Sequence, residues 1–103
     1  MTSLDPEGFP VEADRFAEHH GLDFSFESVG RLPALPDDAA RLGAGCYVGE
    51  VLRRALGGTW QADGTLAGVG HVSETSPLAK ARAGEDLAAY VADVVRYAVP
   101  NAT

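Results

Sequence analysis

The side chains best suited to bind a metal or attack a substrate are three histidines and one cysteine. His19 and His20 are adjacent, and adjacent residues of a helix diverge by about 100°, so this pair cannot face one ion together. His71 would have to converge on them from far along the chain. Solvated positions at a helix end are the better interpretation of the pair, because a cation is favourable there. We therefore predict no metal site and no cofactor.

The lone cysteine allows neither an internal disulfide nor a cysteine-based metal site. On a helix, Cys46 would share a face with Glu50 and Arg53, opposite the apolar stripe. No histidine is tied to this face in sequence, so no base is at hand to activate the thiol. The spacing of Glu50 to Arg53 and Arg54 is that of a surface ion pair worth about 0.3–0.5 kcal/mol. We therefore predict no catalytic residue.

Two tyrosines favour a binding function. Tyr90 and Tyr97 lie two helical turns apart at the edge of an apolar stripe, with Asp86 and Asp93 beside them. Tyrosines flanked by acidic residues are typical of a surface that binds a basic protein. The alternative is that both rings cap the core and keep their hydroxyls in water. The predicted partner-binding residues are Tyr90, Asp93 and Tyr97, with Glu50 and Arg53 as a second patch.

A pocket offers a second hypothesis, in which the protein binds a small molecule or is a small enzyme. Residues 59–62 and 65–72 read as two strands joined by an Asp63-Gly64 turn. Gly68 and Gly70 share one face of the returning strand, which indicates a bulge or close packing of the helix that precedes the hairpin. The pocket would lie between that helix and the sheet. Its predicted lining is Trp60, Gly68, Gly70 and His71, with Glu50 as a further polar group.

A long helix over residues 38–57 is the clearest predicted element. Asp37 or Asp38 can cap its first turn, and Gly57-Gly58 ends it. Its apolar stripe comprises Ala44, Val48, Val51, Leu52 and Ala55. Each glycine inside a helix costs about 1 kcal/mol relative to alanine, and this helix has three. Close approach of another helix or strand is the expected reason for Gly43, Gly45 and Gly49.

Three shorter helices are predicted over residues 11–20, 24–32 and 85–98. The first has a shared face of Val11, Phe16, Ala17 and His20, and ends at Gly21. The second begins after Ser25 as N-cap and points Phe26, Val29 and Leu32 inward. The last has a core stripe of Leu87, Val91, Val94, Val95 and Ala98, and Pro100 stops it.

Residues 73–76 are predicted to form a loop, and residues 77–83 fit either a helix or a third strand. Residues 1–9 and 100–103 are predicted to be flexible tails. The remaining chain, residues 10–99, is expected to be a single α+β domain in which helices pack on a small antiparallel β-sheet.

Composition narrows the classes of partner. The 103 residues suffice for one domain, and 15 acidic against 8 basic side chains give a net charge of −7. Scattered cations in an acidic chain argue against nucleic acid or an anionic membrane as partner, and favour a basic protein. The start lacks the features of a signal peptide, so a cytoplasmic location is expected. The thin core makes a homodimer a further alternative.

The run Leu42 to Leu52, followed by Gly57-Gly58-Thr59-Trp60, resembles small bacterial α+β domains of uncharacterised function. The resemblance rests on an L-G-x-x-x-G-E-V-L helix and a following G-G-x-W. It implies the fold, and some such domains look like immunity or accessory proteins. The preferred function is therefore that of a small acidic accessory or immunity-like protein, which acts by protein–protein interaction and is not an enzyme.

Overall fold

The computed structural model describes residues 8–98, which form five helices and a three-stranded antiparallel sheet. The elements are α1 (Gly8–His20), α2 (Phe26–Val29), α3 (Asp38–Leu56), β1 (Thr59–Trp60), β2 (Leu66–Val69), β3 (Val72–Thr75), α4 (Pro77–Arg82) and α5 (Leu87–Ala98). This confirms the predicted α+β class. The predicted tails at residues 1–7 and 100–103 lie outside the described residues, but residues 8 and 9 already belong to α1, where Phe9 is buried.

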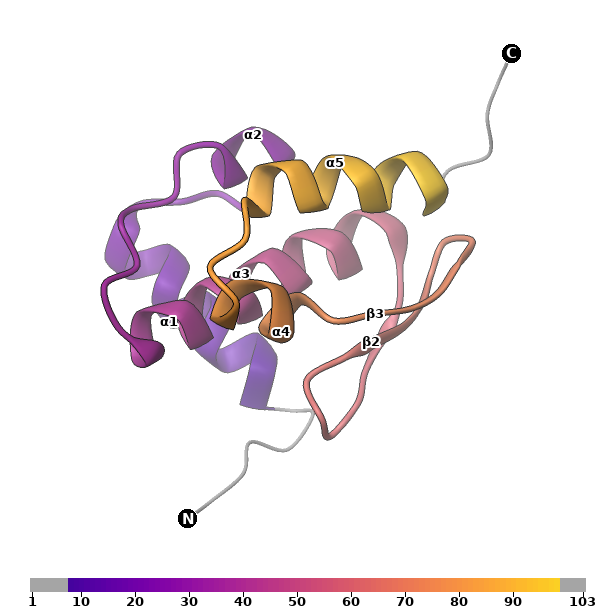
Figure 1. Ribbon diagram of the computed structural model, residues 1–103, viewed down its shortest axis with the longest axis horizontal. Helices are drawn as coiled ribbons and strands as arrows, with labels where there is room; N and C mark the ends of the chain where they lie inside the picture. Colours follow the sequence, from indigo (N-terminus) through magenta and orange to yellow (C-terminus); the bar gives the residue numbers. More distant parts are fainter. Residues whose placement is uncertain (1–7, 99–103) are drawn as a thin grey trace.

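Helix α3 runs through the middle of the molecule, with α5 along one side and α1 along the other (Figure 1). It also contacts α4 and β2. Asp37 caps its first turn by accepting the Ala40 N–H at 2.9 Å, and Gly57 ends it, as predicted. Neighbours surround α3 from Ala44 to Leu52, so every residue of this stretch is buried.

This central position corrects three expectations. Cys46 and Glu50 are fully buried although the helical pattern places them opposite the apolar stripe, because neighbouring elements cover that side of α3 as well. Ala55, predicted in the stripe, is exposed near the end of the helix, beyond these neighbours. The sequence pattern identifies one buried face, whereas a central helix has several.

Close packing explains the three glycines of α3, as predicted. A Cβ at Gly43 would lie 2.8 Å from Cδ2 of Phe16, and one at Gly45 would lie 2.8 Å from Cδ2 of Leu78. A Cβ at Gly49 would overlap the Trp60 ring. Helices α1 and α4 and strand β1 therefore each approach α3 at one of these glycines, which offsets their cost in helix propensity.

The sheet has the order β1-β2-β3, and Trp60 pairs with Leu66 while Leu66 pairs with Thr75. The predicted loop at 73–76 is wrong for residues 73–75, because the chain turns at Gly70-His71 and returns as β3. Gly70 has a φ of 56°, which suits this two-residue turn. The backbone there touches the end of α5, since the His71 N–H donates to the Ala98 carbonyl at 3.0 Å. The helix that packs on Gly70 is therefore α5 and not α3.

The short helices form near the predicted positions but bury partly different faces. In α1 the buried residues are Phe9, Ala13, Phe16 and Ala17, whereas Val11 and His20 are exposed. Ser25 caps α2 as predicted, and Val29 is buried, but Phe26 is 42% exposed. A single turn such as α2 can turn only a narrow face inward, which accounts for the exposure of Phe26.

Residues 77–82 form a helix, α4, which decides between the two alternatives for this segment. Pro77 occupies its first turn, where a missing N–H costs nothing. In α5 the predicted stripe is confirmed: Leu87, Val91, Val94 and Ala98 are buried and Val95 is half-buried. Pro100, the predicted stop, lies outside the described residues. None of the helices within residues 8–98 is both long and apolar enough to cross a membrane.

Candidate functional site

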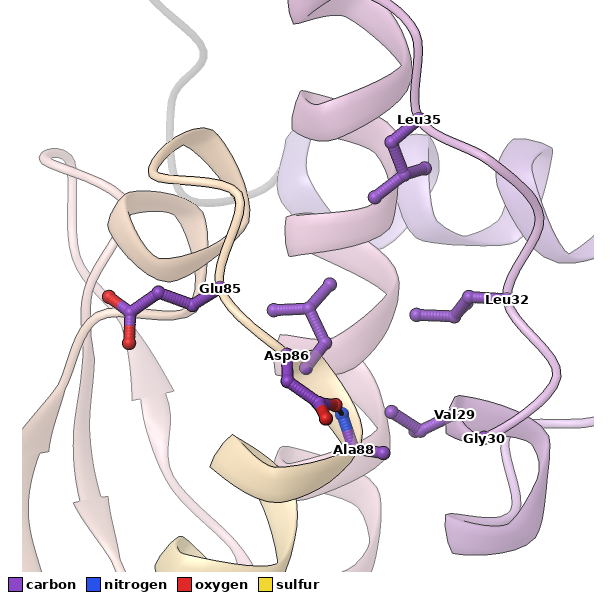
Figure 2. Close-up of a pocket in the computed structure, with 8 residues that line it drawn as sticks. Val29, Gly30, Leu32, Leu35, Glu85, Asp86 and Ala88 are labelled. Carbon is purple, nitrogen blue, oxygen red and sulfur yellow. Dashed lines mark hydrogen bonds between the residues drawn. The ribbon is translucent and has the colours of Figure 1, made fainter.

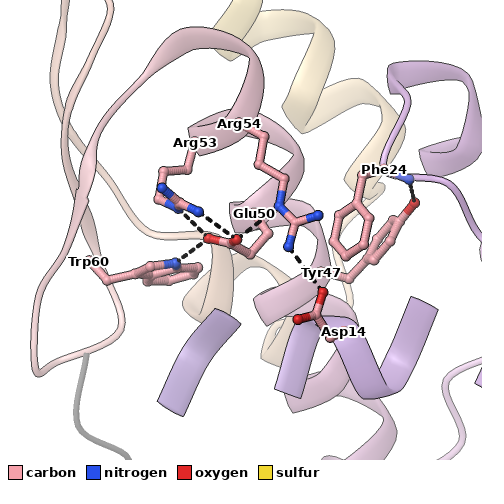
Figure 3. A network of polar contacts seen from close by, with 7 residues as sticks. All are labelled: Asp14, Phe24, Tyr47, Glu50, Arg53, Arg54 and Trp60. Atoms are coloured by element: carbon pink, nitrogen blue, oxygen red, sulfur yellow. Dashed lines mark hydrogen bonds and ion pairs between the residues drawn. The ribbon is translucent and has the colours of Figure 1, made fainter. Parts of the chain in front are cut away.

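The Glu50 carboxylate is the centre of a polar network on α3 (Figure 3). Its Oε2 accepts the Trp60 Nε1–H at 2.8 Å and the Arg53 Nε–H at 2.5 Å. Its Oε1 accepts from Nη2 of Arg53 at 2.9 Å and from Nε of Arg54 at 3.0 Å. A carboxylate has about four acceptor positions, and these bonds occupy them. Burial disfavours the charged carboxylate. The hydrogen bonds from the Arg53, Trp60 and Arg54 side chains outweigh this effect and hold the pKa of Glu50 below its ordinary value.

Arg54 extends this network to a second one around Tyr47. Its Nη2 donates to Asp14 at 3.0 Å, and its guanidinium lies 3.7 Å from the centre of the Phe24 ring. The Phe24 N–H donates to the Tyr47 hydroxyl at 2.8 Å, and that hydroxyl lies 2.5 Å from Ser28 Oγ. Ser28 uses its own proton on the Ser25 carbonyl, so Tyr47 is the donor to Ser28.

The buried polar groups of these networks are satisfied within the fold. No buried side-chain polar atom lacks a hydrogen-bond partner within residues 8–98. Phe24 is the one residue other than glycine with a positive φ in this range, 62°, and the Tyr47 hydroxyl holds it there. The ion pair of Glu50 was predicted at the surface, but Glu50 is 0% exposed and cannot contact a partner, so of the predicted second patch of Glu50 and Arg53 only Arg53 is at the surface, with a side chain that is 37% exposed.

Cys46 is not poised for nucleophilic chemistry. Its side chain is fully buried, and burial, together with the nearby charges of Glu12 and Glu50, raises the pKa of the thiol to about 12. A thiol with such a pKa is protonated at neutral pH, and the protonated form is a poor nucleophile.

The histidines stay apart from any metal-binding geometry in the described part of the chain. His19 and His20 lie exposed at the end of α1 with their rings in edge contact, centroids 4.6 Å apart. His71 is exposed in the turn between β2 and β3. Among residues 8–98, no three histidine, cysteine, aspartate or glutamate side chains come together in a way that could hold a metal ion.

The two tyrosines of the surface predicted on α5 lie in different environments, one buried and one exposed. Tyr90 is buried, and its hydroxyl lies 2.5 Å from Oγ1 of Thr75 in β3. Tyr97 is 70% exposed, and Asp93 is exposed and pairs with Arg96 at 3.7 Å. Tyr90 therefore joins α5 to the sheet, which is a correction, and only Asp93 and Tyr97 of the predicted set lie at the surface.

The alternative pocket between α3 and the sheet is not formed as predicted. The Trp60 ring lies against Gly49 and the Phe9 ring and fills the space between α3 and β1. Gly68, Gly70 and His71 are exposed, and a Cβ at Gly68 would meet nothing within 4 Å. The four residues therefore do not line a common cavity.

Two hollows lie between α5 and the segment that contains α2. One hollow of about 240 Å³ lies beside the start of α5 (Figure 2). Residues of α5, of α2 and of the segments beside them line it: Val29, Gly30, Leu32, Leu35, Glu85, Asp86, Leu87 and Ala88. Figure 2 shows the Asp86 side chain directed toward Ala88, whereas Glu85 points away.

A second hollow of about 340 Å³ continues along α5 from Ala88. Its lining is apolar and consists of Phe26, Ala88, Val91, Ala92 and Val95. Because Ala88 belongs to both hollows and α2 borders both, we treat them as one feature, the α2–α5 groove. Its first hollow carries the carboxylate of Asp86 and its second is apolar.

Sequence reasoning missed this groove, although one signal was available. Ala88, Ala92 and Val95 have the i, i+4, i+7 spacing of a second apolar stripe beside the core stripe of α5. Alanine is weakly hydrophobic and has a high helix propensity, so these residues are easily interpreted as solvent-exposed helix positions. What identifies it is the position of Phe26, which only the tertiary structure provides.

Comparison of the chain with protein-family models, with curated proteins and with solved structures finds no significant match. The candidate site therefore rests on the geometry of this molecule.

Proposed function

We propose that this protein is a non-catalytic interaction module that binds an apolar segment of a basic partner protein in the α2–α5 groove. The observation that carries this proposal is the open apolar hollow of about 340 Å³ between Phe26 and α5. Phe26 is 42% exposed, and Ala88 and Ala92 are exposed on a helix whose other face is already buried in the core. Exposed apolar surface rimmed by polar residues is typical of a protein-binding site.

The charge of the chain supports a basic partner. With a net charge of −7, the protein attracts cationic partners at long range and repels further copies of itself. Two properties of the interior support a role without catalysis: the Glu50 carboxylate has its acceptor positions filled, and the Cys46 thiol is buried with a raised pKa.

The resemblance to small bacterial α+β domains agrees with an accessory or immunity-like role, and we extend the proposal to such a role in the cytoplasm. This part rests on the sequence pattern of residues 42–60 and on composition.

The experiment compares capture of proteins by three forms of the purified chain in extract of its own cells. Ala92→Arg places a long cationic side chain in the groove, whereas Ala89→Arg places the same side chain on an exposed α5 position outside it. Both variants add the same side chain and the same charge to α5, but only Ala92 lines the groove. Any captured protein is then purified and its stoichiometry measured by light scattering.

The proposal expects a one-to-one partner that the wild type and Ala89→Arg retain and that Ala92→Arg binds at least tenfold more weakly. Equal binding by all three forms would place the interaction elsewhere and overturn the groove. A wild-type dimer that Ala92→Arg dissociates would show that a second copy, and not a basic partner, occupies the groove.

A further inference from the structure

We infer that the segment held in the groove is an amphipathic helix, antiparallel to α5, with an arginine or lysine near its C-terminal end that pairs with Asp86. This inference rests on the proposed function, because it names the occupant of the same site. Three properties support this inference: the length of the groove along α5, the placement of Asp86 at one end, and the direction of the α5 dipole.

The length of the groove suits a helix. The groove follows α5 from Asp86 to Val95, which at 1.5 Å per residue is about 14 Å, or between two and three helical turns. Along this line the exposed positions Ala88 and Ala92 are small, so the axis of a second helix can approach closely. Side chains spaced i, i+4 and i+7 on one face of the partner would enter the two hollows in turn.

The charge of the groove sits at one end. Asp86 lines the first hollow and accepts the N–H groups of Ala88 and Ala89 through its Oδ1 at 3.0 and 3.2 Å. Glu85 is turned toward Lys80, whose Nζ lies 3.5 Å from its carboxylate. A carboxylate has more acceptor positions than the two bonds use, so Asp86 can receive a cation while it continues to cap α5. The second hollow, bordered by Phe26, offers no such group.

The nearby cations do not cancel this asymmetry. Arg96 pairs with Asp93 at 3.7 Å toward the far end of α5. Arg31 lies between Gly30 and Leu32 of the first hollow and is exposed, and it forms no ion pair with Asp86 in the described part of the chain. A basic side chain of the partner is therefore favoured beside Asp86 and an apolar one beside Phe26.

The helix dipoles favour one orientation of the partner helix relative to α5. The N-terminal end of α5, where Asp86 lies, carries partial positive charge, and the C-terminal end of a partner helix carries partial negative charge. An antiparallel arrangement brings these two ends together. It also places the basic residue in the last turn of its own helix, where a cation is favourable.

The same charges disfavour a second copy as occupant. A two-fold contact across this face brings two chains of net charge −7 together, and the Arg96 that an antiparallel copy of α5 would bring toward Asp86 is already paired with Asp93. The occupant is therefore a different protein segment, of basic and amphipathic character.

The test uses designed peptides of about 16 residues, long enough to form a partial helix. The first has two leucines four residues apart and an arginine three residues after the second, so that all three share a face. The second replaces that arginine by glutamine. The third moves the arginine to three residues before the first leucine. Affinities are measured by titration calorimetry for the wild type, Asp86→Asn and Ala92→Arg.

Asp86→Asn isolates the charge, because asparagine caps a helix about as well as aspartate. We expect the wild type to bind the first peptide about three- to fivefold more tightly than the second, as for a partly exposed ion pair. Asp86→Asn should remove that difference and leave the affinity for the glutamine peptide unchanged. The third peptide should bind no better than the second.

The outcomes separate the two proposals. If the peptides bind and Ala92→Arg weakens them, but Asp86→Asn affects the arginine and glutamine peptides equally, the orientation and the ion pair are wrong while the groove stands. If no peptide binds although a partner captured from cells requires Ala92, the helix is wrong and the groove again stands. If Ala92→Arg leaves peptide binding unchanged, both proposals fail.

Discussion

At the scale of single residues, Glu50 is the clearest case of a side chain whose role depends on its surroundings. It is 0% exposed, while the side chains of its partners Arg53 and Arg54 are 37% and 38% exposed. An exposed pair of this kind is worth a few tenths of a kcal/mol, whereas breaking a buried pair by removing one partner costs about 3–5 kcal/mol. The Glu50 network lies between these limits because one side of it is in solvent.

We therefore expect Glu50→Gln to lower the free energy of unfolding by about 2–3 kcal/mol, since two guanidinium groups lose their counter-charge. Chemical denaturation followed by circular dichroism measures this change. Asp93→Asn is the matched control, because it breaks the exposed ion pair with Arg96 and should cost no more than about 0.5 kcal/mol. Equal effects of the two substitutions would mean that the network adds nothing beyond a surface pair.

The effect of Glu50→Gln on the free energy of unfolding should depend on pH. The pKa of Glu50 is lowered in the folded state, so its ionised form stabilises the fold above the unfolded pKa of about 4.3. That contribution is lost as the pH falls below this value and through the folded pKa. The stability difference between wild type and Glu50→Gln should thus be constant from about pH 5 to 7 and shrink below about pH 4. A difference that stays constant to pH 3 would contradict this assignment.

At the scale of elements, Tyr47 links α3 to α2, which forms one wall of the α2–α5 groove. Its hydroxyl accepts the Phe24 N–H and donates to Ser28, so it fixes both the turn before α2 and the helix itself. Helix α2 has four residues and could not hold this position by its own hydrogen bonds.

Tyr47→Phe should lower the free energy of unfolding by about 1–2 kcal/mol, because it leaves the Phe24 N–H without its acceptor. Hydrogen exchange of the α2 amides should rise more than that of α5. Tyr97→Phe removes a hydroxyl from a ring that is 70% exposed, and should change neither quantity. If exchange rises equally in both helices, Tyr47 stabilises the whole core and does not specifically position α2.

Glycine packing along α3 makes a second prediction at this scale. Gly49→Ala should destabilise the fold by about 1–3 kcal/mol, because the new Cβ overlaps the Trp60 ring and this outweighs the gain in helix propensity. Gly30→Ala is the control: its φ is −72°, and a Cβ there makes ordinary contact with the Glu27 carbonyl at 3.4 Å. Thermal unfolding should show Gly30→Ala within about 0.5 kcal/mol of the wild type. A stabilised Gly49→Ala would contradict the close contact.

At the scale of the whole molecule, α3 is the central helix on which the other helices and the sheet pack. It contacts α1, α4, α5 and β2, so loss of α3 removes the packing surface of each. Small domains built around one such core unfold in a single cooperative step.

Trp60 provides the probe for this cooperativity, because it is the single tryptophan of the chain and contacts α3. We expect its fluorescence and the helical circular dichroism signal to change at the same denaturant concentration. A fluorescence transition at lower denaturant would mean that the sheet separates from α3 before the helices unfold.

The sequence by itself determined that α1, α2, α3 and α5 are helical, but it placed the start of α1 three residues late and left residues 77–82 open between helix and strand. Capping at Ser25 and Asp37 and the apolar stripe of α5 are local properties, encoded in residues a few positions apart. The glycines of α3 also predicted close neighbours, because glycine lowers the stability of a helix and close packing offsets that loss.

Only the tertiary structure decided which faces are buried. Glu50 and Cys46 are buried because other elements pack against their sides of α3. Tyr90 contacts β3 because the chain turns at Gly70 and returns as that strand. The groove arises in the same way, since Phe26 and the exposed alanines of α5 come from segments far apart in sequence. Periodicity reports one preferred direction per element, and a site formed between two elements requires their relative placement, which periodicity does not contain.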